Sequence, residues 1–259
     1  MDPETYRLVH ETEETHWFFV GRREIIFSFL RSSLPHDHTS RILDVGCGTG
    51  ANLRRLPQFG HVTAVDFSPD ALQFCRSSLA SCDSPLATCD LCCADAGRLP
   101  FAEATFDVVT ALDLVEHLAD DVGGLREFAR VLRPARMLVV SVPAYQVLWS
   151  DFDVLSHHYR RYGRRELAGK LAQAGFRVEK LSHFNTLLFL VVLGVRTVKR
   201  LFNGRWTAET ELNRPPAPVN AFLAGLFASE ATLLKRMDFP FGVSLLGIAR
   251  KATEVRGRD

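Results

Sequence analysis

Residues 42–50, Ile-Leu-Asp-Val-Gly-Cys-Gly-Thr-Gly, are the most informative stretch of this 259-residue chain for its fold. A short apolar run ends at Asp44 and Val45, and glycines then stand at alternate positions, Gly46, Gly48 and Gly50. Alternating glycines allow a tight turn and let the backbone approach a ligand closely. The pattern also predicts a helix directly after the turn, whose free N–H groups would favour an anionic ligand.

Further apolar runs follow at the spacing of an α/β fold. They lie at residues 62–66, 91–94, 106–111, 137–142, near 176–178, and at 243–249. Helical patterns lie between them at 69–79, after Ser68 as a plausible N-cap, and at 121–132. Near-continuous apolar strands separated by helices predict a parallel sheet that is covered on both faces. We therefore expect a doubly wound α/β domain.

Three regions fall outside this alternation. Residues 2–34 have the pattern of an amphipathic helix, residues 143–163 form a loop rich in aromatics and histidines, and a long excursion precedes the last strand. Insertions of this kind usually build the substrate wall above the carboxyl ends of the strands. We predict one domain over residues 1–259: an N-terminal helical cap (1–40), a cofactor-binding core (41–182), a helical insertion or substrate cap (183–241) and the last strand (242–251).

Composition excludes some classes of protein. The net charge is +1 and 47% of the residues are apolar, which gives no reason to expect a nucleic-acid partner. Residues 1–4 are acidic rather than typical of a signal peptide, so we expect a cytoplasmic protein. Cys89 and Cys92 have C-x-x-C spacing, but a zinc site needs four ligands and no second pair follows. We expect reduced thiols and no metal there.

The glycine turn fits either of two cofactors, NAD or S-adenosylmethionine. Gly46-x-Gly48-x-x-Ala51 matches the dinucleotide fingerprint, and Asp66 ends the second strand where a carboxylate can accept the ribose hydroxyls of either cofactor. A dinucleotide enzyme needs a second half-site for nicotinamide, and the sequence offers no candidate.

The motifs as a set resemble those of class I S-adenosylmethionine-dependent methyltransferases. They stand in that family's order and spacing at residues 44–50, 64–68, 94–96, 99–101, 106–109, 112–113 and 116–117. The resemblance implies a seven-stranded, mostly parallel sheet of order 3-2-1-4-5-7-6, with the last strand antiparallel. It also implies methyl transfer from S-adenosyl-L-methionine, with the cofactor held by Asp44, Gly46, Cys47, Gly48, Gly50, Asp66, Phe67, Asp95, Ala96, Leu112 and Asp113.

Residues 14–23, which include His-Trp-Phe-Phe-Val-Gly-Arg-Arg, are similar to a bacterial small-molecule subgroup of these enzymes. That subgroup also carries a Pro-Ala-Tyr loop, here 143–145, and a His-x-x-Arg-Tyr-like stretch, here 157–162. In related quinone-pathway O-methyltransferases an arginine of the N-terminal helix holds the cofactor carboxylate, and Arg22 is the candidate. The alternative, that Arg22 and Arg23 lie on a solvated helix face, stays open.

A hydroxyl acceptor needs a general base or a metal ion. The candidate bases are His117, His157 and His158. Asp113, Glu116 and His117 stand at i, i+3 and i+4, which places them on one side of a helical turn. Quinone-pathway O-methyltransferases bind a divalent cation with a similar set, but this chain has Asp at the first position. We predict a site without metal and leave the cation as an alternative.

The late insertion contains an apolar run at residues 187–193, followed by Arg196, Lys199, Arg200 and Arg205. The run is too short to span a bilayer. The pattern favours a buried cap helix, which a second apolar helix at 222–234 would join. The alternative is a peripheral membrane contact through residues 187–205, with the basic side chains at lipid headgroups.

Together these features predict transfer of a methyl group from S-adenosyl-L-methionine to a small molecule, at an oxygen atom and on a hydrophobic or lipid-linked acceptor. Two other classes remain as alternatives. One is an NAD-dependent oxidoreductase or epimerase. The other is a non-catalytic, membrane-associated protein that retains the fold.

Overall fold

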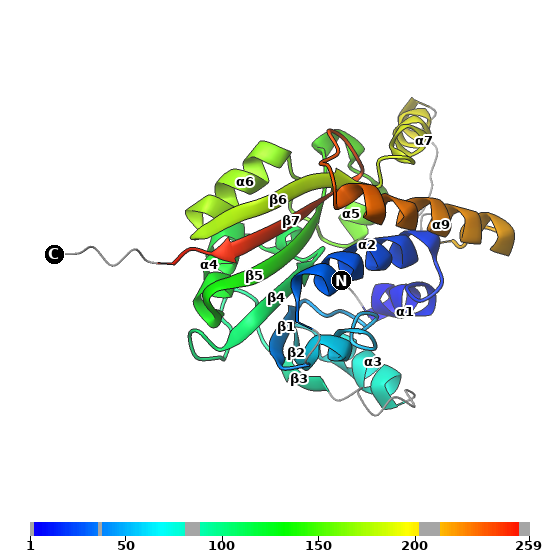
Figure 1. Cartoon of the computed structure of the whole chain (residues 1–259). Coiled ribbons are helices and arrows are strands. Elements are labelled where there is room, and N and C mark those ends of the chain that lie inside the picture. The colour runs from blue at the N-terminus through cyan, green and yellow to red at the C-terminus, as the bar shows by residue number, and fades with distance from the viewer. Residues whose placement is uncertain (1–2, 36–37, 81–88, 202–212, 254–259) are drawn as a thin grey trace.

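The computed structural model describes residues 3–35, 38–80, 89–201 and 213–253 (Figure 1). Its strands are β1 (Ser40–Val45), β2 (Gly60–Asp66), β3 (Cys89–Cys93), β4 (Phe106–Leu112), β5 (Leu132–Pro143), β6 (Phe176–Phe184) and β7 (Ser244–Lys251). Its α-helices are α1 (Pro3–Thr12), α2 (Trp17–Ser33), α3 (Pro69–Ala80), α4 (Asp121–Val131), α5 (Asp151–Leu155), α6 (Arg164–Gln173), α7 (Phe189–Leu201) and α9 (Ala217–Leu234). Short 3₁₀ turns are η1 (Leu56–Phe59), η2 (Val115–His117) and η3 (Gln146–Leu148).

The seven strands form one sheet of order β3-β2-β1-β4-β5-β7-β6, as predicted. The pairs among β1 to β5 are parallel, whereas β7 lies between β5 and β6 and pairs with both in the antiparallel sense. The carboxyl ends of β1, β2 and β4 therefore meet at one edge, which is where ligands bind in open α/β sheets.

Successive residues of the central strands enter two different cores because strand side chains alternate between faces. Leu43 and Val109 pack with α4 and α6 on one face, whereas Ile42 and Val108 pack with α2, α3 and α9 on the other. Both faces of the sheet are thus covered by helices (Figure 1). This explains why β1 and β4 read as continuous apolar runs.

Two predictions about the N-terminal half need correction. No α-helix begins after the glycine turn: residues 51–55 form turns that lead into η1. Pro57 has no N–H to donate to the carbonyl of residue 53, so a helix cannot continue through it. The single amphipathic helix expected over residues 2–34 is two helices, α1 and α2, and the His16 side chain caps α2 by accepting from the N–H of Phe18.

The insertion also differs from the prediction. Helix α9 packs along α2 and buries Phe227, while α7 projects from the body of the molecule (Figure 1). Leu190 and Val198 on α7 are 72% and 54% exposed, so the predicted burial of this helix is wrong. Apolar sequence alone does not show what covers a helix. The side chains of Lys199 and Arg200, and all of Arg205, lie outside the described residues.

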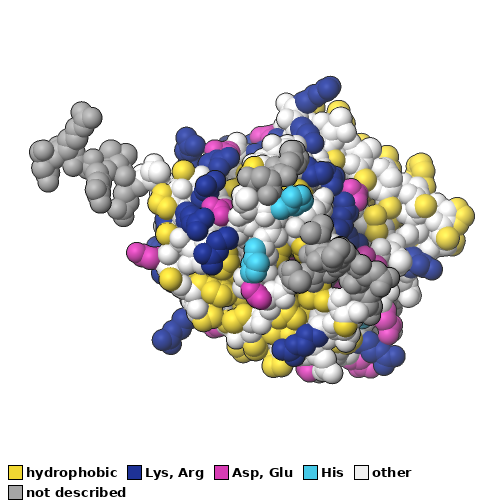
Figure 2. Space-filling model, turned by 60° about the horizontal axis from the view of Figure 1, so that its bottom comes forward, with side chains coloured by type: hydrophobic (Ala, Val, Ile, Leu, Met, Phe, Trp, Pro, Cys, Tyr) yellow, Lys and Arg dark blue, Asp and Glu magenta, His cyan; other side chains and the backbone are white. Residues whose placement is uncertain are grey.

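Helix α9 has the length and apolar composition of a membrane-crossing helix. The core helices of soluble proteins have the same properties, and one side of α9 is occupied by α2. Exposed side chains remain on the other side, including Val219 and Phe222. Figure 2 shows hydrophobic side chains on the projecting lobe at the right, where α9 lies in Figure 1.

Candidate active site

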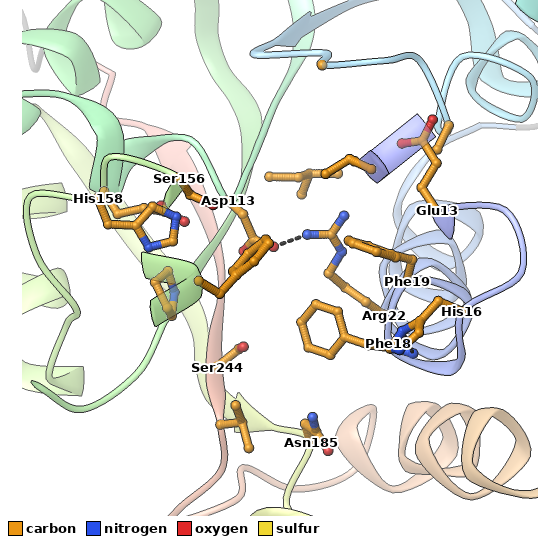
Figure 3. A pocket seen from close by; sticks show the side chains of 18 of the residues that line it. Glu13, His16, Phe18, Phe19, Arg22, Asp113, Ser156, His158, Asn185 and Ser244 are labelled. Carbon is orange, nitrogen blue, oxygen red and sulfur yellow. Dashed lines mark hydrogen bonds and ion pairs between the residues drawn. The ribbon is translucent and has the colours of Figure 1, made fainter. Parts of the chain in front are cut away.

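A cavity of about 560 Å³ opens at the carboxyl ends of β1 and β4 (Figure 3). The glycine turn forms one wall, α2 forms a second, and the end of β4 with η2 forms a third. The loop after β5 and helix α7 form further walls, and α1 and the adjoining ends of β6 and β7 also contribute residues. The lining includes predicted site residues from each of the first three walls: Arg22, Gly46, Cys47, Gly48, Leu112, Asp113, His117 and also His158 from the loop.

The glycine turn has the conformation that its sequence requires. Gly46 and Gly48 have φ angles of +71° and +56°, in the left-handed region that side chains other than glycine rarely adopt. A Cβ on Gly48 would meet no atom within 4 Å, so this part of the turn faces open space. A Cβ on Gly46 would approach Leu114 Cδ1 to 2.7 Å. The turn is therefore packed against Leu114 at Gly46 and is open toward the cavity at Gly48.

Asp66 is held against this turn by backbone hydrogen bonds. Its Oδ2 accepts from the N–H of Gly48 at 2.9 Å, and its Oδ1 accepts from the N–H of Ser68 at 2.9 Å. Burial raises the pKa of the carboxyl, although these hydrogen bonds oppose the shift. Each carboxylate oxygen keeps a second lone pair, so Asp66 can still accept hydrogen bonds from hydroxyl groups of a ligand.

Asp44 lies beneath the turn rather than in the cavity wall. Its Oδ1 accepts from Thr110 Oγ1 at 2.6 Å, and its Oδ2 has no hydrogen-bond partner among the described residues. Burial raises the pKa of Asp44 to about 7. Asp44 in β1 and Asp66 in β2 both lie at the carboxyl ends of their strands, next to the glycine turn.

Besides Asp44, the cavity lining does not include five of the predicted cofactor residues: Gly50, Asp66, Phe67, Asp95 and Ala96. Phe67 is 77% exposed, Asp95 is exposed and accepts from the N–H of Gly97, and Ala96 is buried. They follow β2 and β3, whose ends are joined by the hydrogen bond from Ala94 N–H to Asp66 O at 3.1 Å. The structure thus brings them to one edge, next to Asp66 and outside the cavity lining.

Arg22 projects from α2 into the cavity and forms an ion pair with Asp113 (Figure 3). The guanidinium lies 5.8 and 5.5 Å from the ring centroids of Phe18 and Phe19. Burial lowers the pKa of Arg22 to about 10, which leaves it charged at neutral pH. Arg23 is buried as well and donates to backbone carbonyls of Glu13 and Ala51. The solvated-face interpretation of both arginines is therefore wrong.

Two of the three predicted bases line the cavity and touch each other. The rings of His117 and His158 are perpendicular with centroids 4.5 Å apart. His158 Nδ1 lies 2.8 Å from Oδ1 of Asp153, and Arg161 donates to both oxygens of that carboxylate at 2.9 and 2.8 Å. Burial and the neighbouring His158 lower the pKa of His117 to about 3. His157 is exposed and does not line the cavity.

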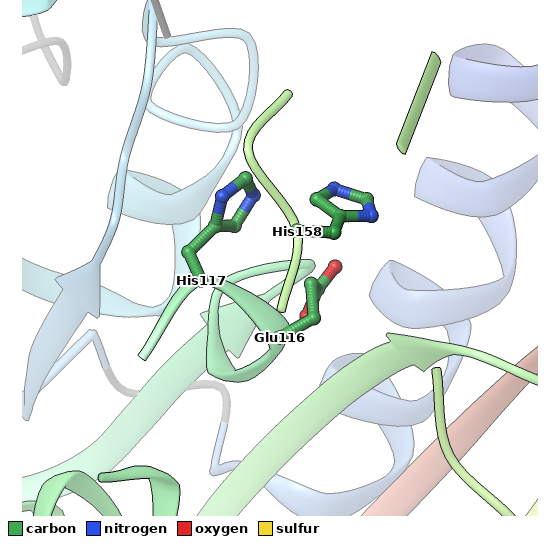
Figure 4. Close-up of side chains that lie close together, drawn as sticks. All are labelled: Glu116, His117 and His158. Atoms are coloured by element: carbon green, nitrogen blue, oxygen red, sulfur yellow. The ribbon is translucent and has the colours of Figure 1, made fainter. Parts of the chain in front are cut away.

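Glu116 completes a cluster with these histidines (Figure 4). It is fully buried, and neither carboxylate oxygen has a hydrogen-bond partner among the described residues. Burial raises its pKa to about 8. One ligand atom from each of Glu116, His117 and His158 lies within 4.8 Å of the others, a spacing that can hold a metal ion.

This cluster is not the set that the sequence suggested. Asp113 has a φ angle of +52° and turns toward Arg22 and Ser141, whose Oγ donates to it at 2.9 Å. Residues 115–117 form a single 3₁₀ turn, so the i, i+3, i+4 spacing of an α-helix does not apply. The residue that joins Glu116 and His117 is His158, from a distant loop.

Sequence reasoning missed three residues of the cavity region: Asp153, Asn185 and Ser244. Asp153 is buried and holds His158, while Asn185 and Ser244 line the cavity from the ends of β6 and β7. Only Asp153 carried a signal in the sequence. Ser150 and Asp153 have the spacing of a capping box, and the structure contains that box at the start of α5.

Comparison with known proteins agrees with this geometry. Residues 43–140 match the family model described as a methyltransferase domain. A probable S-adenosylmethionine-dependent methyltransferase of Mycobacterium tuberculosis is 30% identical over 167 residues, which are 63% of this chain and 56% of that one. A ubiquinone biosynthesis O-methyltransferase of Xanthomonas euvesicatoria is 29% identical over 158 residues, 55% of this chain and 65% of that one.

Solved structures share the fold. A putative methyltransferase of Bacillus halodurans superposes with a TM-score of 0.60 at 20% identity, over 88% of this chain and 99% of that one. The chain spans about half the length of the first curated relatives that it matches. The matched region contains the glycine turn, Asp66, Asp113 and the Glu116–His117 pair.

Proposed function

We propose that this chain, whose residues 43–140 match a methyltransferase domain, is a class I S-adenosylmethionine-dependent enzyme that methylates a small molecule at oxygen. One observation carries the proposal. A single cavity joins the glycine turn, which suits the cofactor, to the buried histidine cluster, which suits deprotonation of an acceptor. The family match also removes the reason to prefer an NAD-dependent oxidoreductase, because the glycine turn lies inside the matched domain.

The residues present fit S-adenosyl-L-methionine, which supplies an activated methyl group on its sulfonium. The turn at Gly48 is open above, and Asp66 stands beside it with free lone pairs for the ribose hydroxyls. Arg22 provides a buried cation for the carboxylate of the methionine part. We assign the adenine to the edge formed by Phe67, Asp95 and Ala96.

Oxygen is the proposed acceptor atom because the cavity contains a candidate general base, His158, whose ring is oriented by a hydrogen bond with Asp153. A hydroxyl group is a weak nucleophile until it loses its proton. The hydrogen bond to Asp153 occupies Nδ1 of His158, so the proton of the acceptor would go to Nε2. Methyl transfer itself needs mainly alignment of the reacting atoms, and the walls of the cavity supply it.

The acceptor is proposed to be hydrophobic or lipid-linked. The cavity lining includes four aromatic side chains, Trp17, Phe18 and Phe19 from α2 and Phe152 from α5, and it also includes Val191, Val192 and Val195 of α7. The same helix presents Leu190 and Val198 to the outside. An apolar helix that lines the cavity and is also exposed would let the protein collect such an acceptor at a membrane surface. We therefore propose a cytoplasmic protein in peripheral contact with the membrane.

Label transfer tests this function. The purified protein is incubated with methyl-labelled S-adenosylmethionine and with cell extract divided into organic-soluble, aqueous small-molecule and nucleic-acid fractions. We expect label in the organic-soluble fraction, and we expect the His158→Gln variant to lose most of it. Label in nucleic acid, or no label in any fraction, would contradict the proposal.

A further inference from the structure

Asn185 lies in the cavity at the junction of β6 and α7. Its side chain is 1% exposed, and Figure 3 shows it in the cavity together with Ser244. Among the residues that the structure describes, neither its Oδ1 nor its Nδ2 has a hydrogen-bond partner. Buried amide groups in proteins normally have such partners. The unpaired amide in a cavity therefore indicates a ligand that supplies them.

The backbone explains why asparagine is tolerated here, but not where its side chain points. Asn185 has a φ angle of +57°, a conformation that asparagine adopts more readily than most residues. Its backbone carbonyl accepts from the N–H of Val243 at 3.4 Å. Glycine would serve this backbone equally well. None of the described contacts therefore gives the side-chain amide a role in the turn.

Ser244 stands next to Asn185 because β6 and β7 are paired. Phe184, directly before Asn185, is the register partner of Ser244. Both residues line the cavity, together with the apolar side chains of Trp17, Phe18 and Val243. In the view of Figure 3 the ring of Phe18 lies between Asn185 and the Arg22–Asp113 pair. The cavity wall beside the amide is therefore largely apolar, and a buried carboxyl nearby is that of Glu230, which accepts from the N–H groups of Thr186 and Leu187 directly after Asn185.

We propose that Asn185, with Ser244 beside it, forms the subsite that recognises the methyl acceptor through a neutral polar group. The group presents a hydrogen-bond acceptor and a donor side by side, as a carboxamide or a hydroxy-ketone does. Its carbonyl oxygen accepts from Nδ2 of Asn185, and its N–H or O–H donates to Oδ1. A carboxylate fits poorly, because it has no donor for Oδ1 and carries a charge into an apolar wall.

The assignment of this ligand as the methyl acceptor rests on the proposed function, whereas its chemistry does not. Two matched probes separate the possibilities. 4-Hydroxybenzamide carries the neutral donor–acceptor pair, and 4-hydroxybenzoate has almost the same shape but is an anion without the donor. Their binding to the full chain is measured by calorimetry, with and without saturating S-adenosylhomocysteine.

We expect the amide to bind about tenfold more tightly than the carboxylate, the ratio that one additional hydrogen bond gives. The Asn185→Gly variant retains the backbone conformation and removes the amide, so the preference should fall to near unity. Asn185→Asp keeps the size of the side chain but has no N–H donor, and it should lose binding of the amide probe as well. Affinity for S-adenosylhomocysteine should be unchanged in both variants, which shows that they fold.

A preference that persists in Asn185→Gly, a wild-type preference for the carboxylate, or absence of amide binding would each overturn the proposal. Failure of the proposed function gives a different result. In that case the wild-type chain does not bind S-adenosylhomocysteine, while the Asn185-dependent preference between the two probes remains measurable in its absence.

Discussion

His158 and Asp153 are joined by a hydrogen bond of 2.8 Å between Nδ1 and Oδ1. Burial opposes ionisation of Asp153, but the hydrogen bonds from His158 and Arg161 outweigh it and hold its pKa below the usual range. An ionised carboxylate only accepts hydrogen bonds, so Nδ1 must carry a proton. Nε2 is then free to take a proton from an acceptor, and Asp153 acts as a positioning residue.

Asp153→Asn should lower the rate of methyl transfer roughly 10²–10⁴-fold, because an amide no longer fixes the protonated Nδ1. The measurement is single-turnover label transfer over a range of pH. Asp151→Asn is the matched control, since Asp151 is an exposed residue of the same short helix and should leave the rate unchanged. Equal effects of the two substitutions would rule out the positioning role.

Arg22→Met should weaken S-adenosylhomocysteine about 10- to 100-fold, the effect of removing one charge-assisted hydrogen-bonded pair. Binding of adenosine, which lacks the carboxylate, should change little. Both affinities are measured by calorimetry, with Arg31→Met as the control on the outer part of α2. Equal losses for the two ligands would show that Arg22 supports the fold of the cavity rather than binding the carboxylate.

Glu116→Gln should alter the dependence of stability on pH. Below about pH 4.5 the carboxyl is protonated in both the folded and the unfolded chain. As the pH rises toward 8, the unfolded chain loses this proton while the buried group keeps it, so the free energy of unfolding falls. Each unit of the pKa difference corresponds to about 1.4 kcal/mol.

The Glu116→Gln variant should therefore lose less stability than the wild type between pH 5 and pH 8. Urea unfolding in the presence of EDTA measures this difference without a contribution from bound cations. Parallel pH profiles for the two proteins would mean that the carboxyl is not protonated in the folded state.

Replacing Leu190 and Val198 together by serine should reduce binding to anionic phospholipid vesicles, because these side chains are the exposed apolar part of α7. Vesicle sedimentation measures the bound fraction, and affinity for S-adenosylhomocysteine should not change. Unaltered vesicle binding by this double variant would exclude α7 as the contact.

The sheet, and the position of Asp44 and Asp66 at one of its edges, were predictable because they depend on local patterns. Apolar runs that end at Asp44 and Asp66 place both carboxyls at one edge, whatever the loops do. The absence of a helix directly after the glycine turn shows where local patterns fail. The motif predicts a helix there, but Pro57 lies beyond the motif and prevents an α-helix from continuing. The exposure of α7 also could not be predicted, because an apolar run does not reveal its partners.

The substrate side of the site depends on contacts between distant segments. His157 and His158 are equivalent in the sequence, and only the cap at Ser150 and the hydrogen bond to Asp153 separate their roles. Asn185 enters the cavity because β6 and β7 pair at Phe184 and Ser244. No spacing of residues along the chain predicts either arrangement.

Calorimetric titration with S-adenosylhomocysteine is the most direct test of whether this cavity binds the methyltransferase cofactor. We expect binding by the wild-type chain and by Asp90→Ala, a control at an exposed carboxyl of β3. Binding should be weakened at least about tenfold in Asp66→Ala, which removes the carboxylate beside the glycine turn, and NAD should give no heat. Tight binding of NAD, or no binding of S-adenosylhomocysteine by the wild type, would contradict the assignment of this site to a methyltransferase.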